Sequence, residues 1–225
     1  MRARVPALAA VLLVLAGPAA AGAWPRAPGE VFLSFRGEVE TSDGGPQTNA
    51  SVYGEYGLTR RITLIAQFDN ADDPWTPRRF GTGVQFALSG PDAVNRYAIG
   101  FGVSTPPDVM GAMTSTRGEL SLSWGRGFDS RWGGGWATAT ARLIYGRDTS
   151  RPITDLYGLV GLRPAEGRMA MLSASRYADD DGTYWKISPS LGYRLRGETW
   201  LVPSLTQELS DDRSTAVGLA LWITF

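Results

Sequence analysis

The sequence predicts an all-β protein, an up-and-down antiparallel β-barrel of about twelve strands that crosses a membrane. Apolar and polar residues alternate along most of the chain, which is the period of a strand. The alternating segments are roughly ten residues long, as a tilted strand needs to cross a bilayer. Aromatic residues gather near the segment ends, as at the two interfaces of a membrane barrel: Tyr56, Phe68, Trp75, Phe80, Trp132, Trp136, Tyr184, Trp185, Tyr193 and Trp200.

The first three predicted strands show the pattern most clearly. In residues 31–40, Val31, Leu33 and Phe35 share one face, and Ser34 and the charged residues that follow share the other. Residues 50–58 and 62–69 repeat the alternation across a tight turn at residues 59–60. We expect the apolar face of each strand to contact lipid and the polar face to line the interior.

Nine further segments continue the pattern. They are residues 80–89, 96–104, 117–126, 135–147, 154–163, 168–177, 183–196, 198–209 and 214–225. An even number of strands brings both ends of the chain to the same side of the barrel, as in bacterial single-chain barrels. The seventh to ninth strands alternate most weakly, so ten strands is the alternative. A soluble β-sandwich also has one apolar and one polar face per strand, but faces crowded with glycine, serine and charge favour a polar barrel interior.

The N-terminus has the features of a secretory signal peptide over residues 1–23. Arg2 and Arg4 precede an apolar run over residues 5–15, and small residues follow as far as Ala23. Cleavage after Ala23 fits the small-x-small pattern and would leave a barrel domain over residues 24–225, with residues 19–21 as a competing site. The apolar run is too short for a transmembrane helix, so an N-terminal anchor is the lesser alternative.

The last nine residues form one alternating strand. Its apolar face comprises Val217, Leu219, Leu221, Ile223 and the terminal Phe225. This strand resembles the C-terminal targeting strand of Gram-negative outer-membrane β-barrels, and residues 56–64 are similar to hairpins of outer-membrane transport barrels. The resemblance is to the small, channel-type members of that family.

The resemblance implies a location, partners and a targeting role. The chain would lie in the outer membrane among lipid and lipopolysaccharide, after insertion by the barrel assembly machinery, with Leu221, Ile223 and Phe225 acting in targeting. The last strand must also pair with the first, around residues 31–39, so that no strand edge faces lipid.

The connections between strands fall alternately into two sets. One is rich in aspartate: residues 42–46, 69–77, 105–114, 148–152, 179–182 and 211–212. The other leans towards arginine: residues 59–60, 90–95, 125–134, 163–168 and 196–197. With the N-terminus in the periplasm, we expect the aspartate set to face outside the cell.

Composition narrows the chemistry. The chain has no histidine and no cysteine, which excludes a Ser–His–Asp triad, Cys–His pairs and histidine- or thiolate-bound zinc. We therefore expect no enzyme, no cofactor and no metal site. Residues 179–182 lack the spaced ligands of an EF-hand. Twenty-two basic residues balance 22 acidic ones, so a nucleic-acid partner is not expected.

The polar strand faces carry charges of both signs, which we expect to line the lumen: Arg36, Glu38, Glu55, Arg96, Arg117, Glu119, Arg142, Lys186, Arg194 and Glu208. They predict a narrow passive channel for small hydrophilic solutes. Barrels of eight strands are usually filled, and those of sixteen usually contain an aqueous channel. The alternative is therefore a closed structural or accessory barrel that supports export or assembly of a surface polysaccharide.

Overall fold

A computed structural model describes residues 22–42, 45–71, 79–105, 116–146, 150–210 and 214–225. These residues form a closed barrel of twelve antiparallel strands, which confirms the predicted fold class and strand number. The strands are β1 Val31–Ser42, β2 Gly45–Gly57, β3 Ile62–Ala71, β4 Arg79–Ala87, β5 Asn95–Thr105, β6 Arg117–Ser130, β7 Gly133–Tyr145, β8 Ile153–Ala165, β9 Arg168–Ala178, β10 Thr183–Arg196, β11 Thr199–Glu208 and β12 Thr215–Thr224. Residues 1–21 of the predicted signal peptide lie outside the described residues.

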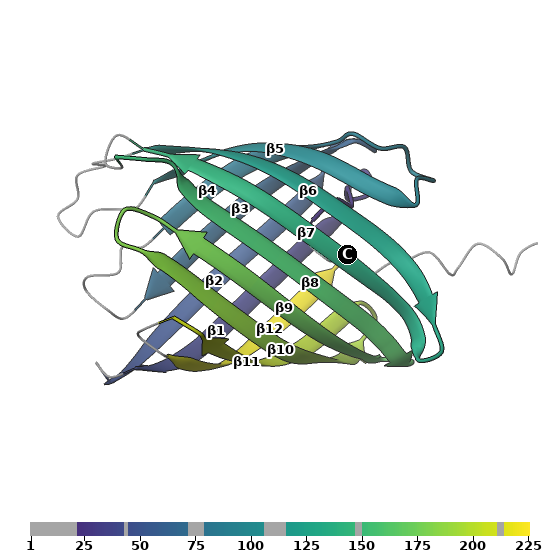
Figure 1. Ribbon diagram of the computed structural model, residues 1–225. Coiled ribbons are helices and arrows are strands. Elements are labelled where there is room, and N and C mark those ends of the chain that lie inside the picture. Colours follow the sequence, from purple (N-terminus) through teal and green to yellow (C-terminus); the bar gives the residue numbers. More distant parts are fainter. Residues whose placement is uncertain (1–21, 43–44, 72–78, 106–115, 147–149, 211–213) are drawn as a thin grey trace, which may run out of the picture.

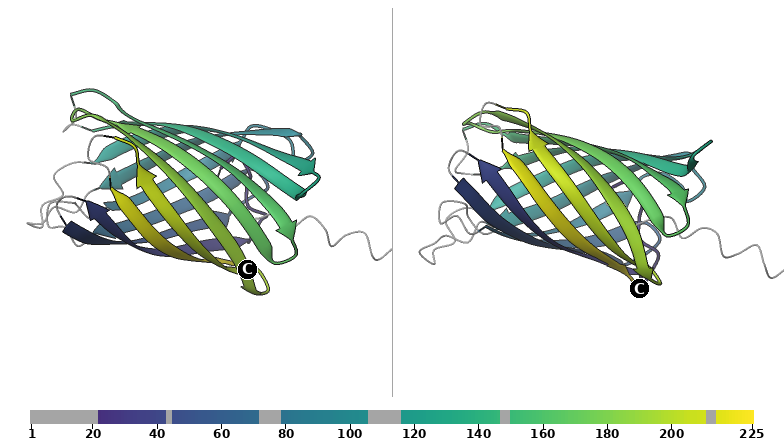
Figure 2. Two further views of the ribbon diagram at one scale, coloured as in Figure 1. Left: turned by 60° about the horizontal axis from the view of Figure 1, so that its bottom comes forward. Right: turned by 90° about the horizontal axis from the view of Figure 1, so that it is seen from below.

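The chain meanders from β1 to β12, and each strand pairs with its neighbours in sequence (Figure 1). The last strand then closes the ring against the first, as the sequence predicts (Figure 2). Phe35 lies opposite Leu221 in this register, and Val39 lies opposite Val217. The terminal Phe225 exchanges two backbone hydrogen bonds with Val31, of 2.8 and 3.0 Å. Closure therefore leaves no strand edge unpaired.

The barrel has two different ends. At one end, which we call the turn end, lie Phe225 and the short connections that include Thr59, Trp132 and Gly197 (Figure 1). At the other, the loop end, lie the connections in which aspartate is common. Several residues of that set, including 72–77 and 106–114, lie outside the described residues. No helix in the described ranges is long and apolar enough to cross a membrane.

Burial alternates along the strands with period two. In β1, Phe35 and Val39 are exposed on the outer face, whereas Arg36, Glu38 and Glu40 are half-buried on the inner face. Large apolar side chains on the outer face recur around the ring, as at Phe101, Leu122 and Leu219. The outer face is therefore apolar and the inner face is largely polar, as a membrane barrel requires.

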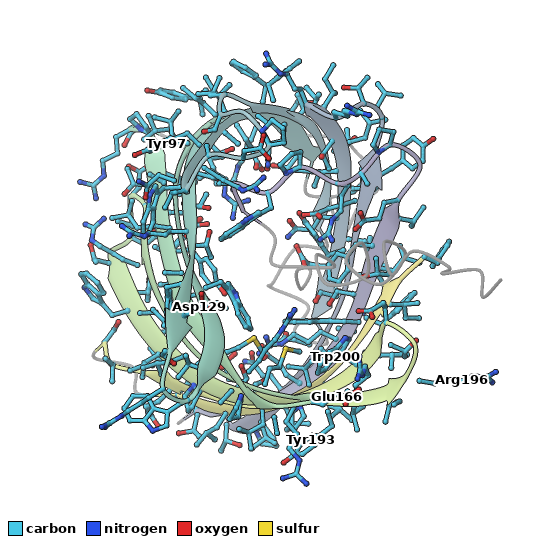
Figure 3. All side chains as sticks on the ribbon, turned by 90° about the vertical axis from the view of Figure 1, so that its right-hand side faces the viewer. Tyr97, Asp129, Glu166, Tyr193, Arg196 and Trp200 are labelled. Atoms are coloured by element: carbon cyan, nitrogen blue, oxygen red, sulfur yellow. The ribbon has the colours of Figure 1, made fainter. Side chains whose placement is uncertain are left out.

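Three aromatic residues predicted for the membrane interfaces lie inside the barrel instead. Trp136 and Trp200 are only 5% and 9% exposed, and Trp200 lies on the inner side of the wall in Figure 3, whereas Tyr193 lies outside it. Tyr184 shares the inner face with Lys186. The reason is the alternation of side chains along a strand. Each of these residues stands an even number of positions from an inward-facing charged residue on the same strand, so it faces inward too. Trp75 lies outside the described residues.

Candidate functional site: the charged interior

All ten residues that the sequence predicts to line the lumen occupy inner-face positions of their strands. They do not form one group, because the strands place them at different depths. Seven of them belong to four separate clusters, and each cluster contains charges of opposite sign.

The first cluster surrounds Arg142 of β7. Its Nη1 lies 3.3 Å from Glu119 Oε2 on β6, and its Nη2 donates a 2.6 Å hydrogen bond to Asp155 Oδ2 on β8. Asp155 was not among the predicted residues, although it stands at an inner position of its strand. One arginine thus bridges carboxylates on the two neighbouring strands, a use that suits its planar fork.

The second cluster surrounds Lys186 of β10. Its Nζ lies 3.4 Å from Glu208 Oε2 on the adjacent β11 and 3.4 Å from Glu40 Oε1 on β1. Because β11 and β12 stand between β10 and β1, the contact with Glu40 crosses the interior over two strands. Ser214 adds hydrogen bonds to both carboxylates. Side chains from non-adjacent strands therefore meet inside the barrel.

The third and fourth clusters lie on the neighbouring strands β1 and β2. Arg36 Nη2 is 2.6 Å from Glu38 Oε2 two residues along the same strand. On β2, Tyr53 donates a 2.6 Å hydrogen bond to Glu55 Oε1. The other oxygen of Glu55 accepts from Arg26 Nε, and both side chains are almost fully buried. Arg26 lies before the first strand, in a segment to which the sequence analysis assigned no structure.

Two predicted residues serve the turn end rather than the middle of the lumen. Arg96 donates a hydrogen bond to the carbonyl of Pro91 in the connection before β5. Arg194 Nη2 lies 2.6 Å from Glu166 Oε1, in the turn between β8 and β9. Arg117 lies at the opposite end, as the first residue of β6.

Residues 22–30 enter the barrel at the turn end, and we call this segment the N-terminal strap. Its first two residues, Gly22 and Ala23, precede the predicted cleavage site. Gln85 Nε2 donates a 2.6 Å hydrogen bond to the carbonyl of Gly22, and the backbone N–H of Arg26 donates to Thr63 Oγ1 at 3.1 Å. Gly29 then bonds to Gly57 on β2. The strap thus contacts β2, β3 and β4 from within, and Ala23 and Arg26 are only 1% and 6% exposed.

Two glycines of the wall make room for the strap. A Cβ atom on Gly57 would lie 1.9 Å from the carbonyl oxygen of Ala27, and one on Gly125 would lie 2.5 Å from the indole of Trp24. Both distances are far below any real contact, so neither position accepts a side chain without displacing the strap. Glycine there allows two stretches of backbone, or backbone and indole, to approach closely.

An apolar cluster fills the opposite side of the interior near the turn end. It consists of Trp136, Met169, Met171, Trp200, Val202 and Ala220, with Trp24 of the strap packed against it. Trp136 covers Gly161, whose Cβ would lie 2.2 Å from the indole. This side of the interior is therefore apolar near the turn end, whereas the side against the strap carries the Arg26–Glu55 ion pair.

The described residues contain no group of three or more histidine, cysteine, aspartate or glutamate side chains that could hold a metal ion. In the 179–182 connection, Asp179 Oδ1 accepts the backbone N–H groups of Asp181 and Gly182, each at 3.0 Å. Asp180 accepts two hydrogen bonds from Ser150. These carboxylates thus stabilise the connection itself.

Comparison with known proteins identifies the architecture. The KdgM porin, solved in complex with disordered oligogalacturonate, superposes with a TM-score of 0.65 at 9% identity, over 86% of this chain and 99% of that one. The NanC porin gives 0.66 at 8% identity, over 84% and 98%. The chain has the fold of outer-membrane porins. An outer membrane channel from Pseudomonas putida F1 gives 0.57 at 12% identity, over 93% and 99%.

Comparison of the sequence alone adds no relative. No protein family matches the chain, and no curated protein does. The similarity to the porins therefore concerns the fold of the barrel and does not extend to the side chains of the interior.

Proposed function

We propose that this protein is an outer-membrane channel through which small hydrophilic solutes pass passively. The observation that carries the proposal is the contact of Lys186 with Glu40 across two intervening strands. It puts fixed charges of both signs inside the barrel, where they would act on a solute that passes along the axis. The porin fold of the barrel supports the same function.

The charge clusters would determine what passes. Arg142 and Lys186 each face two carboxylates, so each cluster has a net negative charge when its carboxylates are ionised. Removal of either cation leaves two carboxylates in the interior without their cationic partner. We expect such a variant to favour cations more than the wild type does.

The experiment is single-channel recording of the purified protein in planar bilayers under a salt gradient. Lys186→Gln should shift the reversal potential towards cation selectivity, and Arg126→Gln, at an exposed position on the outer face, should not. Discrete conductance steps from the wild type are required. Their absence would contradict the channel proposal.

The strap and the apolar cluster favour a second function, a closed structural or accessory barrel that supports export or assembly of a surface polysaccharide. Trp24, Trp136 and Trp200 bring three indoles to the turn end of the interior, and an apolar layer there opposes the passage of ions. In this case neither the wild type nor Lys186→Gln conducts, although both are folded.

The proposed location brings further expected partners. Phospholipid and lipopolysaccharide would contact the outer face, and the barrel assembly machinery would recognise Leu221, Ile223 and Phe225. In support, Phe225 lies at the end of the closing strand with its side chain 70% exposed.

A further inference from the structure

The outer face of the barrel has a hollow of about 570 Å³ over strands β6 to β9. Its floor consists of small side chains, namely Ala139, Ala141, Gly158 and Ala174. The strand register explains the shape, because Ala139 lies opposite Gly158 and Gly158 lies opposite Ala174. Three neighbouring strands thus place small residues in one row, and the large side chains around this row give the hollow its sides.

Large residues form the sides of this hollow. Trp124 lies next to Ala139 in the register, and Tyr97 lies next to Trp124. Towards the loop end, Leu156 of β8 and Trp185 of β10 stand in one row, with Arg176 of β9 between them. The result is an apolar groove that runs across three strands. Its length along the row of small residues is roughly 10–15 Å at the usual spacing of strands.

One cation stands at the loop-end side of the groove. Arg176 lies two residues before the end of β9. Its Nη1 donates a 3.2 Å hydrogen bond to Thr154 Oγ1, and its guanidinium lies 5.9 Å from the ring centre of Trp185. Within the described ranges it forms no ion pair with a carboxylate. An arginine on the lipid-facing side is costly near the midplane and tolerable near the headgroups, where phosphate can complete its hydrogen bonds.

We propose that this groove binds one phosphorylated lipid from the leaflet at the loop end. An acyl chain would lie along Ala139, Gly158 and Ala174, and Arg176 would bind the phosphate with Trp185 beside it. This proposal rests on the proposed membrane location, but it does not depend on whether the lumen conducts.

The test is native mass spectrometry of delipidated protein in detergent with dioleoyl phosphatidic acid as the probe. Gly158→Leu fills the groove, and its Cβ meets only a carbonyl oxygen at 3.9 Å. Gly37→Leu is the matched control, because Gly37 is an outer-face glycine with open space around it. Arg176→Gln removes the charge, and Arg126→Gln is its control on the outer face.

The proposal requires that each wild-type barrel retains one lipid when the complex is mildly activated in the mass spectrometer. Its affinity should fall about tenfold in Gly158→Leu and in Arg176→Gln, with both controls unchanged. Equal lipid binding by all five proteins would overturn it, because only unspecific lipid would then be present. Tight binding of inorganic phosphate alone, or a protein dimer that Gly158→Leu abolishes, would also overturn it.

Single-channel recording of the same variants separates the two proposals. Gly158→Leu and Arg176→Gln alter only the outer face, so both should conduct as the wild type does. A silent wild type that still binds one lipid would contradict the channel and leave the lipid site standing. A conducting wild type whose lipid binding does not depend on the groove would contradict the lipid site and leave the channel proposal standing.

Discussion

Gly57 is the residue at which wall and strap come closest. The backbone of Gly57 also bonds to Gly29 and Glu30 of the strap, at 2.8 and 2.9 Å. A methyl group there would collide with the backbone of Ala27, which cannot move aside as the end of a flexible side chain can. This one position therefore controls whether the strap stays in the barrel.

The expected result of Gly57→Ala is release of the strap. Arg26 is 6% exposed in the wild type, so trypsin should not cut after it while the strap is in place. In the variant we expect rapid cleavage after Arg26, measured by N-terminal sequencing or mass spectrometry. Gly118→Ala is the control, because a Cβ there meets nothing within 4 Å. Equal protection in both variants would show that the strap does not depend on Gly57.

Leu122 tests the assignment of faces at the level of one residue. It lies in the middle of β6 on the outer face and is 56% exposed. Leu122→Arg should lower the free energy of unfolding by about 2–4 kcal/mol if the side chain lies near the bilayer midplane. Ser121→Arg, on the inner face of the same strand, should cost less. Unfolding in urea from lipid vesicles measures both, and equal losses would contradict the face assignment.

At the scale of elements, two connections at the loop end are held together by one carboxylate. Asp180, between β9 and β10, accepts hydrogen bonds from Ser150 Oγ and N–H at 2.7 and 2.8 Å, and Arg151 Nε lies 3.3 Å away. The hydrogen bonds from Ser150, followed by the charge of Arg151, lower the pKa of the Asp180 carboxyl. The ionised form thus links this connection to the one between β7 and β8.

A lowered pKa fixes the direction of the pH effect. The contribution of Asp180 is complete above the ordinary pKa of an aspartate and is lost as the pH falls through its lower value in the folded state. We expect exchange of the Ser150 amide hydrogen, corrected for its intrinsic rate, to accelerate on acidification. Asp180→Asn should exchange fast at every pH. A wild-type rate without pH dependence would contradict the link.

The element that closes the barrel shows how local pattern and topology agree. In β12, Val217 and Leu219 face outward and Ala216 and Ala220 are buried inside, so the alternation read from the sequence fixes its faces. Pairing with both β1 and β11 then satisfies its backbone on both sides. A strand that ends the chain can do so only if the barrel closes.

For the whole molecule, the two sets of connections predict an orientation in the membrane. Asp180 lies at the loop end and Arg61 at the turn end. Because the native chain has no cysteine, a single introduced thiol reports its own side. In intact cells, a membrane-impermeant thiol reagent should label Asp180→Cys and not Arg61→Cys. The opposite labelling would show that the barrel has the reverse orientation in the membrane.

The sequence by itself predicted a barrel of about twelve strands with ten as the alternative, the two faces of each strand and the pairing of the first strand with the last. The faces follow from the period of two, which is a local property of each strand. The pairing of first and last strand follows from the need to pair every strand edge, which is a property of the topology. The same alternation could have predicted that Trp136 and Trp200 face inward, because Trp136 shares a strand face with Arg142 and Trp200 shares one with Glu208. Aromatic residues at strand ends look alike in sequence whether they face lipid or lumen.

Only the tertiary structure decided which charges meet and what enters the barrel. Alternation places Lys186 on an inner face, but its contact with Glu40 depends on curvature that brings β10 and β1 within reach across two strands. The strap has no period to reveal it, and its place depends on Glu55, Thr63 and Gly57, which are far away in the sequence. Contacts between distant segments are set by the closed geometry of the barrel, and no local pattern records them.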